Sequence, residues 1–420
     1  MIRDEKTLKN QDAGLQANEA SIFFASYGKW VWAVLLLVGV WYNFLPLIAT
    51  SLFLLLLSLM ITLWGKWSLL RVEASLELSK YRMFPGEEFQ LEASIYNKKW
   101  LPLVWLEWNF DEKDGIVLGD GMGDNSLLRF LWILWYKEVN WTIKGRASNR
   151  GVYNIGEITL CSGDGFRFSE SREKYDLDRT IYIYPKLIPV NPPRLFPSLQ
   201  WGASGQRGGF LEDPLLVDGI REYEDGDELR RMNWKATART GKLQSNTYQP
   251  VILQQLVVYG DIQGFILEEI PHTNPDELRE YQVKMEEDFE HFLSVIASLL
   301  VKYMENGINT ALAMNALNHL GRPMTSSMPA INPNLILDKL ASCSQQSSIG
   351  DMTPLEELLN KLGDSSPIFV FTYKIRRGHY LWYQKNRHRF TTIHIYYMYK
   401  SKYVSKLQTV AKSIEDLILS

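Results

Sequence analysis

The sequence predicts a multidomain membrane protein with two N-terminal transmembrane helices, a β-sandwich middle domain and a C-terminal α/β domain with a doubly wound sheet. Three observations predict it: an uncharged apolar block near the N-terminus, period-two patterns after it, and alternating strands and helices in the last part. The 420 residues also exceed the roughly 250 to 300 at which a single core stops growing.

The apolar block runs from Trp30 to Trp64 without a charged residue. As one helix it would be about 50 Å long, against a hydrocarbon layer of about 30 Å. Pro46 disfavours helix at the residue before it and so provides a break. We therefore expect a helical hairpin over 22–66, after a polar tail over 1–21. The second span covers 47–64, whereas the start of the first is open.

Basic residues flank this hairpin. Lys29, Lys66 and Arg71 lie at its outer ends, and the connecting turn carries no charge. Because cytoplasmic flanks carry the excess of Lys and Arg, both ends and everything after Arg71 are expected in the cytoplasm. The first expected partner is thus the lipid bilayer of the cell membrane.

Residues 67–188 show the alternation of half-buried strands. Phe89, Leu91, Ala93 and Ile95 point one way between polar residues, and the turn signal Phe84-Pro85-Gly86-Glu87 precedes them. Similar runs are LVWLEWNF, VNWTIKG, GVYNIGEITL and TIYIYP. Short strands with turns between them predict a β-sandwich. The tryptophan-rich stretch LRFLWILWYKEVNW fits a core strand, which we favour, or a membrane-facing patch.

Residues 189–250 combine a linker with a charged segment. KLIPVNPPRLFPSLQ and WGASGQRGGF are typical of an exposed connector, and a domain boundary is expected near Ile188. VDGIREYEDGDELRRMNWKATART, Val217 to Thr240, follows.

Residues 251–420 alternate between strands and helices. A long amphipathic helix is predicted from Asp276 to Glu305, with an apolar stripe of Met285, Phe289, Phe292, Ile296, Leu299 and Tyr303. Strands are expected in LVVY, INTALAMN, PIFVFT and TTIHIYYM, and further helices at 334–341, 354–362 and 404–419. This alternation predicts a parallel sheet covered on both faces.

Within the charged segment we expect an extended run over 220–223, then a helix capped by Asp227 that continues to Arg239 and stops at Gly241. Exposed ion pairs contribute only about 0 to 1 kcal/mol each. The collection of both charge signs around Trp234 and Tyr223 therefore favours a buried or interfacial network that docks the segment on the α/β domain. A partner-binding surface and a catalytic site are the alternatives.

The same segment resembles the signature of the domain-of-unknown-function 58 family. Its matching residues include Arg221, Glu222, Tyr223, Gly226, Asp227, Arg230, Trp234, Lys235 and Arg239. Arg150-Gly151-Val152-Tyr153 and Ser162-Gly163-Asp164-Gly165-Phe166 resemble the end of that family's β region. The order of two spans and a trailing von Willebrand factor A-like domain is also similar, so the resemblance covers nearly the whole chain.

This resemblance implies a membrane-anchored protein that works with MoxR-type AAA+ ATPases in assembling or maturing other proteins. Our first hypothesis is a non-enzymatic scaffold that binds such an ATPase and client proteins. The matching residues would then form a partner-binding or structural motif. The competing hypothesis is a cell-envelope enzyme that uses Glu222, Asp225 and Asp227 as acids, helped by Arg221 or Lys235.

A third hypothesis is a metal-dependent adhesion module. Metal-binding von Willebrand A domains carry an Asp-x-Ser-x-Ser loop after the first strand, whereas this sequence has Asp261-Ile262-Gln263-Gly264-Phe265. Both serines are missing, and Phe371-Thr372-Tyr373 after a later strand supplies no acid. The loop at Asp261 is therefore interpreted as degenerate, and no metal or cofactor is expected.

Several other classes are disfavoured. A net charge of −3 gives no basic field for nucleic acid. The sequence has no G-x-x-x-x-G-K-[ST] loop, so any ATPase is expected on another chain. Two cysteines far apart, Cys161 and Cys343, predict buried thiols without a disulfide framework.

Overall fold

The computed structural model describes residues 28–111, 115–119, 126–165, 168–193, 195, 212–224, 227–250, 255–266, 275–347, 352–362, 366–390 and 392–419. The chain forms two compact units, an N-terminal unit to Tyr184 and a C-terminal unit from Pro185. The expected polar tail and the start of the first span lie outside the described residues.

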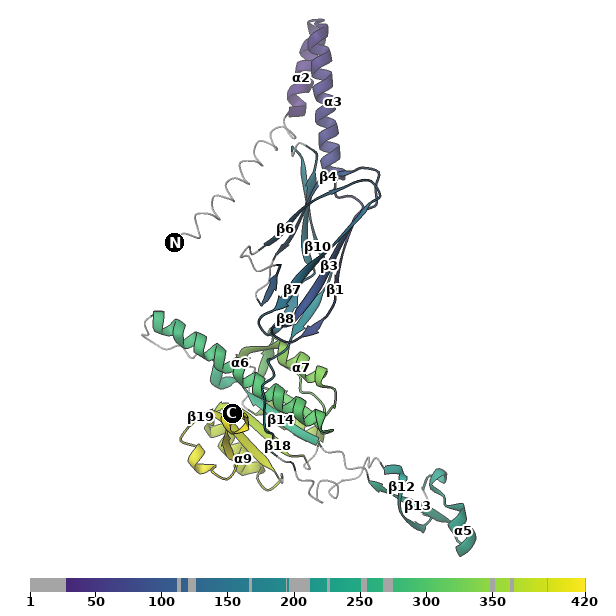
Figure 1. Ribbon diagram of the computed structural model, residues 1–420, viewed down its shortest axis with the longest axis vertical. Coiled ribbons are helices and arrows are strands. Elements are labelled where there is room, and N and C mark those ends of the chain that lie inside the picture. Colours follow the sequence, from purple (N-terminus) through teal and green to yellow (C-terminus); the bar gives the residue numbers. More distant parts are fainter. Residues whose placement is uncertain are drawn as a thin grey trace. The chain divides into compact units, whose positions relative to one another are not determined.

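Two apolar helices open the N-terminal unit, α2 (Gly28–Trp41) and α3 (Leu45–Trp67). The break falls at 42–44, and Pro46 lies in the first turn of α3, where its missing N–H costs little. The helices lie side by side (Figure 1), with Gly39 so close to Ile48 that an added Cβ would meet its side chain at 3.1 Å. Of the described helices, α3 alone is long and apolar enough to cross a membrane.

The C-terminal end of α3 is fixed to the β domain that follows it. A Cβ on Gly65 would lie 2.0 Å from the Ser169 hydroxyl, so only glycine allows this approach. Just beyond the helix, Lys99 Nζ donates to the carbonyl of Ser68 at 2.5 Å. The helix end and the β domain are thus packed directly against each other.

The β domain contains two four-stranded antiparallel sheets around one core. Their orders are β1-β3-β7-β5 and β10-β9-β4-β6, and a small sheet of order β2-β11-β8 adjoins them. The strands are β1 (Val72–Leu78), β2 (Arg82–Met83), β3 (Glu88–Asn97), β4 (Leu103–Asp111), β5 (Ile116–Leu118), β6 (Ser126–Ile133), β7 (Glu138–Ala147), β8 (Gly151–Asn154), β9 (Glu157–Gly163), β10 (Glu170–Asp176) and β11 (Thr180–Ile183).

The predicted alternation is confirmed in β3. Phe89, Leu91, Ala93 and Ile95 are all buried. Each fully buried side chain of this size contributes about 1.5 to 3 kcal/mol. The sheets meet through edge-to-face aromatic packing of Trp108 on β4 with Trp141 on β7, whose ring centroids lie 5.4 Å apart.

Core packing of the whole tryptophan-rich stretch is wrong. Strand β6 lies at a sheet edge and pairs only with β4 within its sheet. Ile133 points inward and is buried, whereas Phe130 and Trp132 lie on the opposite face and are exposed. Period-two geometry places alternate residues on opposite faces, and the core covers one face of this strand.

The C-terminal unit is built on a five-stranded, all-parallel sheet of order β15-β14-β18-β19-β20. The strands are β14 (Gln255–Asp261), β15 (Asn309–Met314), β18 (Ile368–Lys374), β19 (Ile393–Tyr399) and β20 (Ala411–Ser413), and a ribbon of β16 (Ala316–Asn318) and β17 (Cys343–Ser347) accompanies them. The helices are α6 (Pro275–Glu305), α7 (Pro333–Ser342), α8 (Thr353–Leu362) and α9 (Arg377–Asn386), with the 3-10 turn η3 (Gln263–Phe265).

Helices cover both faces of this sheet, with α6 and α9 on opposite sides in Figure 1. All six residues of the predicted α6 stripe are buried, as predicted. On one face, Tyr303 of α6 packs on Phe369 of β18 with ring centroids 6.0 Å apart. The neighbouring strand residue Val370 joins the opposite core, which includes Leu355 of α8 and Trp382 of α9.

The helix predicted over 404–419 is wrong. The chain there forms the 3-10 turns η4 (Val404–Lys406) and η5 (Ile414–Leu417), separated by β20. Strand β20 extends the sheet by pairing with β19, and Leu407 is buried. Pairing at the sheet edge overrides the helical spacing in the sequence.

The two ends of the C-terminal unit are joined. Val190 forms a bridge with Ile418, and the backbone N–H of Asn191 donates to Leu417 at 2.8 Å. The N–H of Leu419 donates to Pro189 at 3.1 Å. The entering chain and the C-terminal tail therefore run antiparallel over this short stretch.

Candidate functional site

The charged segment lies on a two-stranded antiparallel hairpin within the C-terminal unit. Its strands are β12 (Glu212–Glu222) and β13 (Gln244–Pro250), and the connection carries the 3-10 turn η2 (Leu229–Arg231) and the helix α5 (Trp234–Thr240). The predicted extended run at 220–223 coincides with the end of β12. Gly226 and Asp225 lie outside the described residues.

Asp227 organises the turn after β12. Its Oδ1 accepts from Arg221 Nη2 at 2.6 Å, and its Oδ2 accepts from the backbone N–H of Glu224 at 3.1 Å. Tyr223 donates its hydroxyl to the carbonyl of Asp227 at 3.1 Å. The hydrogen bond from the Glu224 backbone, with the donor and charge of Arg221, holds the pKa of Asp227 below its usual range.

The predicted helix start at Asp227 is wrong. The helix α5 begins at Trp234 and is capped by Asn233, whose side chain accepts from the N–H of Ala236 at 2.9 Å. Asp227 caps nothing downstream because its oxygens are turned back to Glu224 and Arg221. The predicted stop is confirmed, since Gly241 has a φ of 70°.

The motif residues do not form a buried network, so that expectation is wrong for the described part of the segment. Trp234 is 69% exposed and Leu229 is 71% exposed. Arg230, Lys235 and Arg239 are also exposed. The stretch from the start of η2 at Leu229 to the end of β13 at Pro250 is short and has few positions from which to cover an indole, which explains why local charge pairing does not bury it.

The exposed acids of the described part of this segment, Glu222, Glu224 and Glu228, each form ion pairs. Glu222 Oε1 lies 2.9 Å from Lys242 Nζ on the partner side of the hairpin, and Glu228 lies 3.6 Å from Arg230. A general acid needs a raised pKa. The lowered pKa of Asp227 is the opposite shift, so this carboxylate is suited to holding Arg221 in place.

A second polar cluster surrounds Asp261, the last residue of β14. The chain leaves β14 for β15 on one side and later enters β18 on the other, which makes the β14/β18 junction a topological switch point, the usual ligand position in such sheets. Asp261 is fully buried. Its Oδ1 accepts from Asn315 Nδ2 at 2.6 Å and from the backbone N–H of Gln263 at 3.2 Å.

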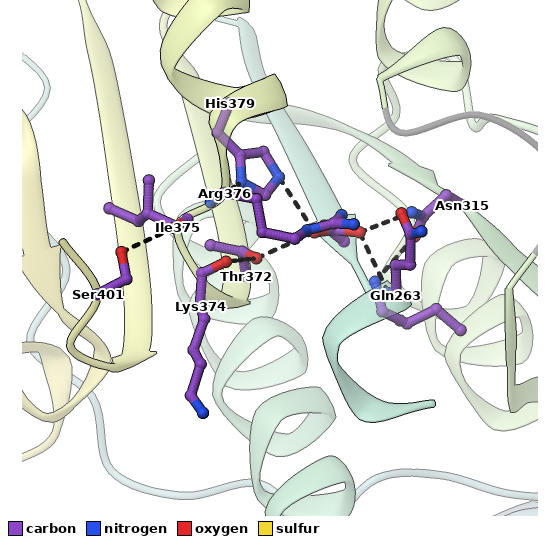
Figure 2. Close-up of polar contacts among 10 residues, drawn as sticks. Gln263, Asn315, Thr372, Lys374, Ile375, Arg376, His379 and Ser401 are labelled. Carbon is purple, nitrogen blue, oxygen red and sulfur yellow. Dashed lines mark hydrogen bonds and ion pairs between the residues drawn. The ribbon is translucent and has the colours of Figure 1, made fainter. Parts of the chain in front are cut away.

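Thr372 on β18, Arg376 just before α9 and His379 on α9 point toward one place (Figure 2), where they face the other carboxylate oxygen of Asp261. Asp261 Oδ2 lies 2.7 Å from Arg376 Nη2, 3.0 Å from the Thr372 hydroxyl and 3.0 Å from His379 Nε2. The His379 Nδ1 accepts the backbone N–H of Arg376, so Nε2 is the nitrogen that carries a proton. Within the described part of the chain this buried Nε2 meets the geometric criteria of no hydrogen bond, and the carboxylate 3.0 Å away is the acceptor that faces it.

Five donors thus converge on one carboxylate, and the guanidinium of Arg376 is one of them. Burial alone would raise the pKa of Asp261, but the donor from His379, the charge of Arg376 and the donor from Asn315 outweigh it and hold the pKa well below its usual range. Among the described residues no group of three or more His, Cys, Asp or Glu is placed to hold a metal ion.

Arg376 and His379 were missed from the sequence. The prediction examined the end of this strand for an acidic ligand, at Phe371-Thr372-Tyr373, and found none. The sequence did contain a signal, the basic run Lys374-Ile375-Arg376-Arg377 at the end of a buried strand. The carboxyl ends of parallel strands meet at one edge of the sheet, so these cations were candidates to face Asp261 at the end of its own strand.

No protein-family model matches the sequence. Over 243 residues the chain is 21% identical to the uncharacterized protein YeaD of Bacillus subtilis (strain 168), covering 57% of this chain and 55% of that protein. The chain therefore spans about half the length of this curated relative.

Solved structures also show partial similarity. The sporulation control protein Spo0M of Bacillus subtilis matches 27% of this chain and 49% of its own, with 14% identity and a TM-score of 0.14. A cohesin of Archaeoglobus fulgidus matches 26% of this chain and 84% of its own, with 11% identity and a TM-score of 0.15. Similarities at these TM-scores carry no argument about fold or function.

Proposed function

We propose that this protein is a membrane-anchored, non-enzymatic scaffold that binds a protein partner through the exposed part of the charged segment. The anchor is the helical hairpin of α2 and α3, with both soluble units on the cytoplasmic side of the cell membrane. The partner suggested by the family resemblance is a MoxR-type AAA+ ATPase acting on client proteins.

One observation carries this proposal, the exposure of Trp234 and Leu229 beside Arg230 on the η2–α5 segment. Interface hot spots are enriched in tryptophan and arginine, since these side chains combine a large apolar area with directed charge. Trp234 leaves 69% of its surface exposed to water, and a second protein surface that covers it would bury this apolar area.

The turn below this surface is suited to holding it in place. Arg221, Tyr223 and Asp227 bond to one another and to the backbone, and Asn233 fixes the first turn of α5. An ordered surface loses less conformational entropy on binding. The motif therefore divides into a supporting part around Asp227 and a contacting part around Trp234.

The test is capture of the purified MoxR-type ATPase by the full-length protein in nanodiscs. Trp234→Ala should weaken binding by about 30-fold or more, the effect of a hot-spot truncation of about 2 kcal/mol. Leu320→Ala is the control, because Leu320 is also a large apolar residue, 63% exposed in the same unit, but lies after β16 and outside the charged segment.

Arg221→Ala separates the supporting part from the contacting part. It should weaken capture and also accelerate amide exchange around Asp227, whereas Trp234→Ala should leave exchange there unchanged. Equal capture by the Trp234→Ala and Leu320→Ala proteins would refute the proposed binding surface.

A further inference from the structure

We propose that the β-sandwich lies with an aromatic collar in the headgroup layer of the membrane that α3 enters. The aromatic collar is the set of exposed rings at one end of the domain, Trp100, Phe130, Trp132, Trp135 and Tyr136. The inference rests on α3 crossing the bilayer, and it adds a second, peripheral membrane contact to that anchor.

Backbone contacts place the collar beside the end of α3. The N–H of Tyr136 donates to the carbonyl of Lys99, and the N–H of Lys98 donates to the carbonyl of Arg71. Lys99 Nζ in turn donates to the carbonyl of Ser68, the residue after α3. The loop that carries Trp100 and the turn that carries Tyr136 therefore adjoin the point where the helix ends.

The direction of β6 extends the collar away from that point. Ile133 pairs with Leu103 at the helix end of the sheet, whereas Ser126 pairs with Asp111 at the far end. At about 3.3 Å per residue, Trp132 lies one step from Ile133 and Phe130 about 10 Å from it. The exposed rings are thus concentrated toward α3.

The exposed area is too large for an ordinary surface. Five rings of about 200 Å² each, between 55% and 69% exposed, leave about 600 Å² of mostly aromatic surface uncovered. On a soluble protein such a patch marks an interaction site.

Chemistry and continuity favour lipid as the occupant. Tryptophan and tyrosine concentrate at membrane interfaces, where the ring is apolar and the polar atom reaches water or headgroups. Trp67, at the last turn of α3, is itself exposed, so the collar continues an aromatic end of the membrane helix. Lys66, Arg71 and Lys137 supply cations beside it for lipid phosphates.

The test uses the full-length protein in nanodiscs that hold one copy each, with single cysteines labelled by a bimane fluorophore. The native thiols, Cys161 and Cys343, are buried. Labels at Trp132→Cys and Trp135→Cys are compared with Val117→Cys. Val117 is also an exposed apolar residue, but it pairs with Arg146, opposite Glu88 at the far end of β3.

Nitroxide attached near the lipid headgroup should quench the labels at 132 and 135 at least threefold more strongly than the label at 117. Quenching at 132 and 135 no stronger than at 117 would overturn the inference. Shielding of these sites only in nanodiscs that hold two copies would also overturn it, because a second copy of the chain would then cover the collar.

A label in the middle of α3, at Leu56→Cys, distinguishes this failure from failure of the anchor. Leu56 is exposed on the helix surface. Quenching at 56 by nitroxide deep in the acyl chains, without quenching at 132 and 135, would leave the anchor standing and refute the collar. No quenching at 56 would refute the membrane anchor, and the collar with it.

Discussion

Asp261→Asn should loosen the C-terminal unit at the centre of its sheet. Asparagine keeps the shape of the side chain but removes its negative charge and replaces one acceptor oxygen with an NH₂ group. Donors face both carboxylate oxygens, Asn315 on one side and Arg376 on the other. In either orientation of the new amide, its NH₂ group faces a donor. Arg376 also loses the negative charge with which it pairs.

The magnitude follows from burial. Removing one partner of a buried ion pair costs about 3 to 5 kcal/mol. Because the Arg376 side chain is 30% exposed, water replaces part of the lost interaction, so we expect the lower end, about 3 kcal/mol. At 1.4 kcal/mol per factor of ten, local opening should become about 100-fold more frequent.

Native-state hydrogen exchange of the full-length protein measures this opening. Amides of β14 and β18 should exchange about 100-fold faster in the Asp261→Asn protein. Glu305→Gln is the matched control, since Glu305 also faces a cation, Lys302 at 3.4 Å, but both side chains are exposed. That pair contributes at most about 1 kcal/mol.

The stability of the C-terminal unit should also depend on this interaction at acid pH. Since the pKa of Asp261 is lower in the folded state than in the unfolded state, its stabilisation is complete above the ordinary carboxyl pKa of about 4 and is lost as the pH falls below it. The Asp261→Asn protein should lack this component of the acid response. If β14 amides of the Asp261→Asn and Glu305→Gln proteins exchange equally at neutral pH, the reasoning about this cluster is refuted.

Two further changes concern the junction of α3 with the β domain. Burial lowers the pKa of Lys99 in the folded protein to about 8, despite the opposing charge of Glu173. Between about pH 8 and 10.5 the Lys99 side chain is therefore protonated in the unfolded chain but neutral in the folded protein. Thermal unfolding should therefore show stability rising through that window, and Lys99→Met should remove this rise; an unchanged slope would contradict it. Gly65→Ala should lower the melting temperature because its Cβ meets Ser169, and adding Ser169→Gly should restore most of the loss. No rescue by the second substitution would show that the contact is not the cause.

Periodicity predicted the elements that a single strong pattern determines. The stripe of α6 and the alternation of β3 are both observed because each face is either core or solvent over many residues. The chain after Val404 has helical spacing too, but it finds a free sheet edge beside β19 and pairs there. Sequence spacing contains no information about which strand lies at an edge.

The candidate sites show the same limit. The charge pattern drew attention to the segment around Asp227, yet it could not show that Asp227 turns back toward Arg221 and leaves the cap of α5 to Asn233. Nor could the sequence place His379 against Asp261. The two residues are 118 positions apart in the chain, and the parallel sheet brings His379 Nε2 to within 3.0 Å of Asp261 Oδ2. Contacts made through tertiary structure need the topology first.

The paired ends of the C-terminal unit determine how it would respond to pulling. A force applied between the chain entering at Pro189 and the tail at Leu419 acts first on the short antiparallel stretch that bridges Val190 and Ile418. Those few bonds would break while the strands of the sheet stay unloaded. Once they open, the load passes to η5, where Ile414 and Leu417 are buried, and then to β20 at the edge of the sheet.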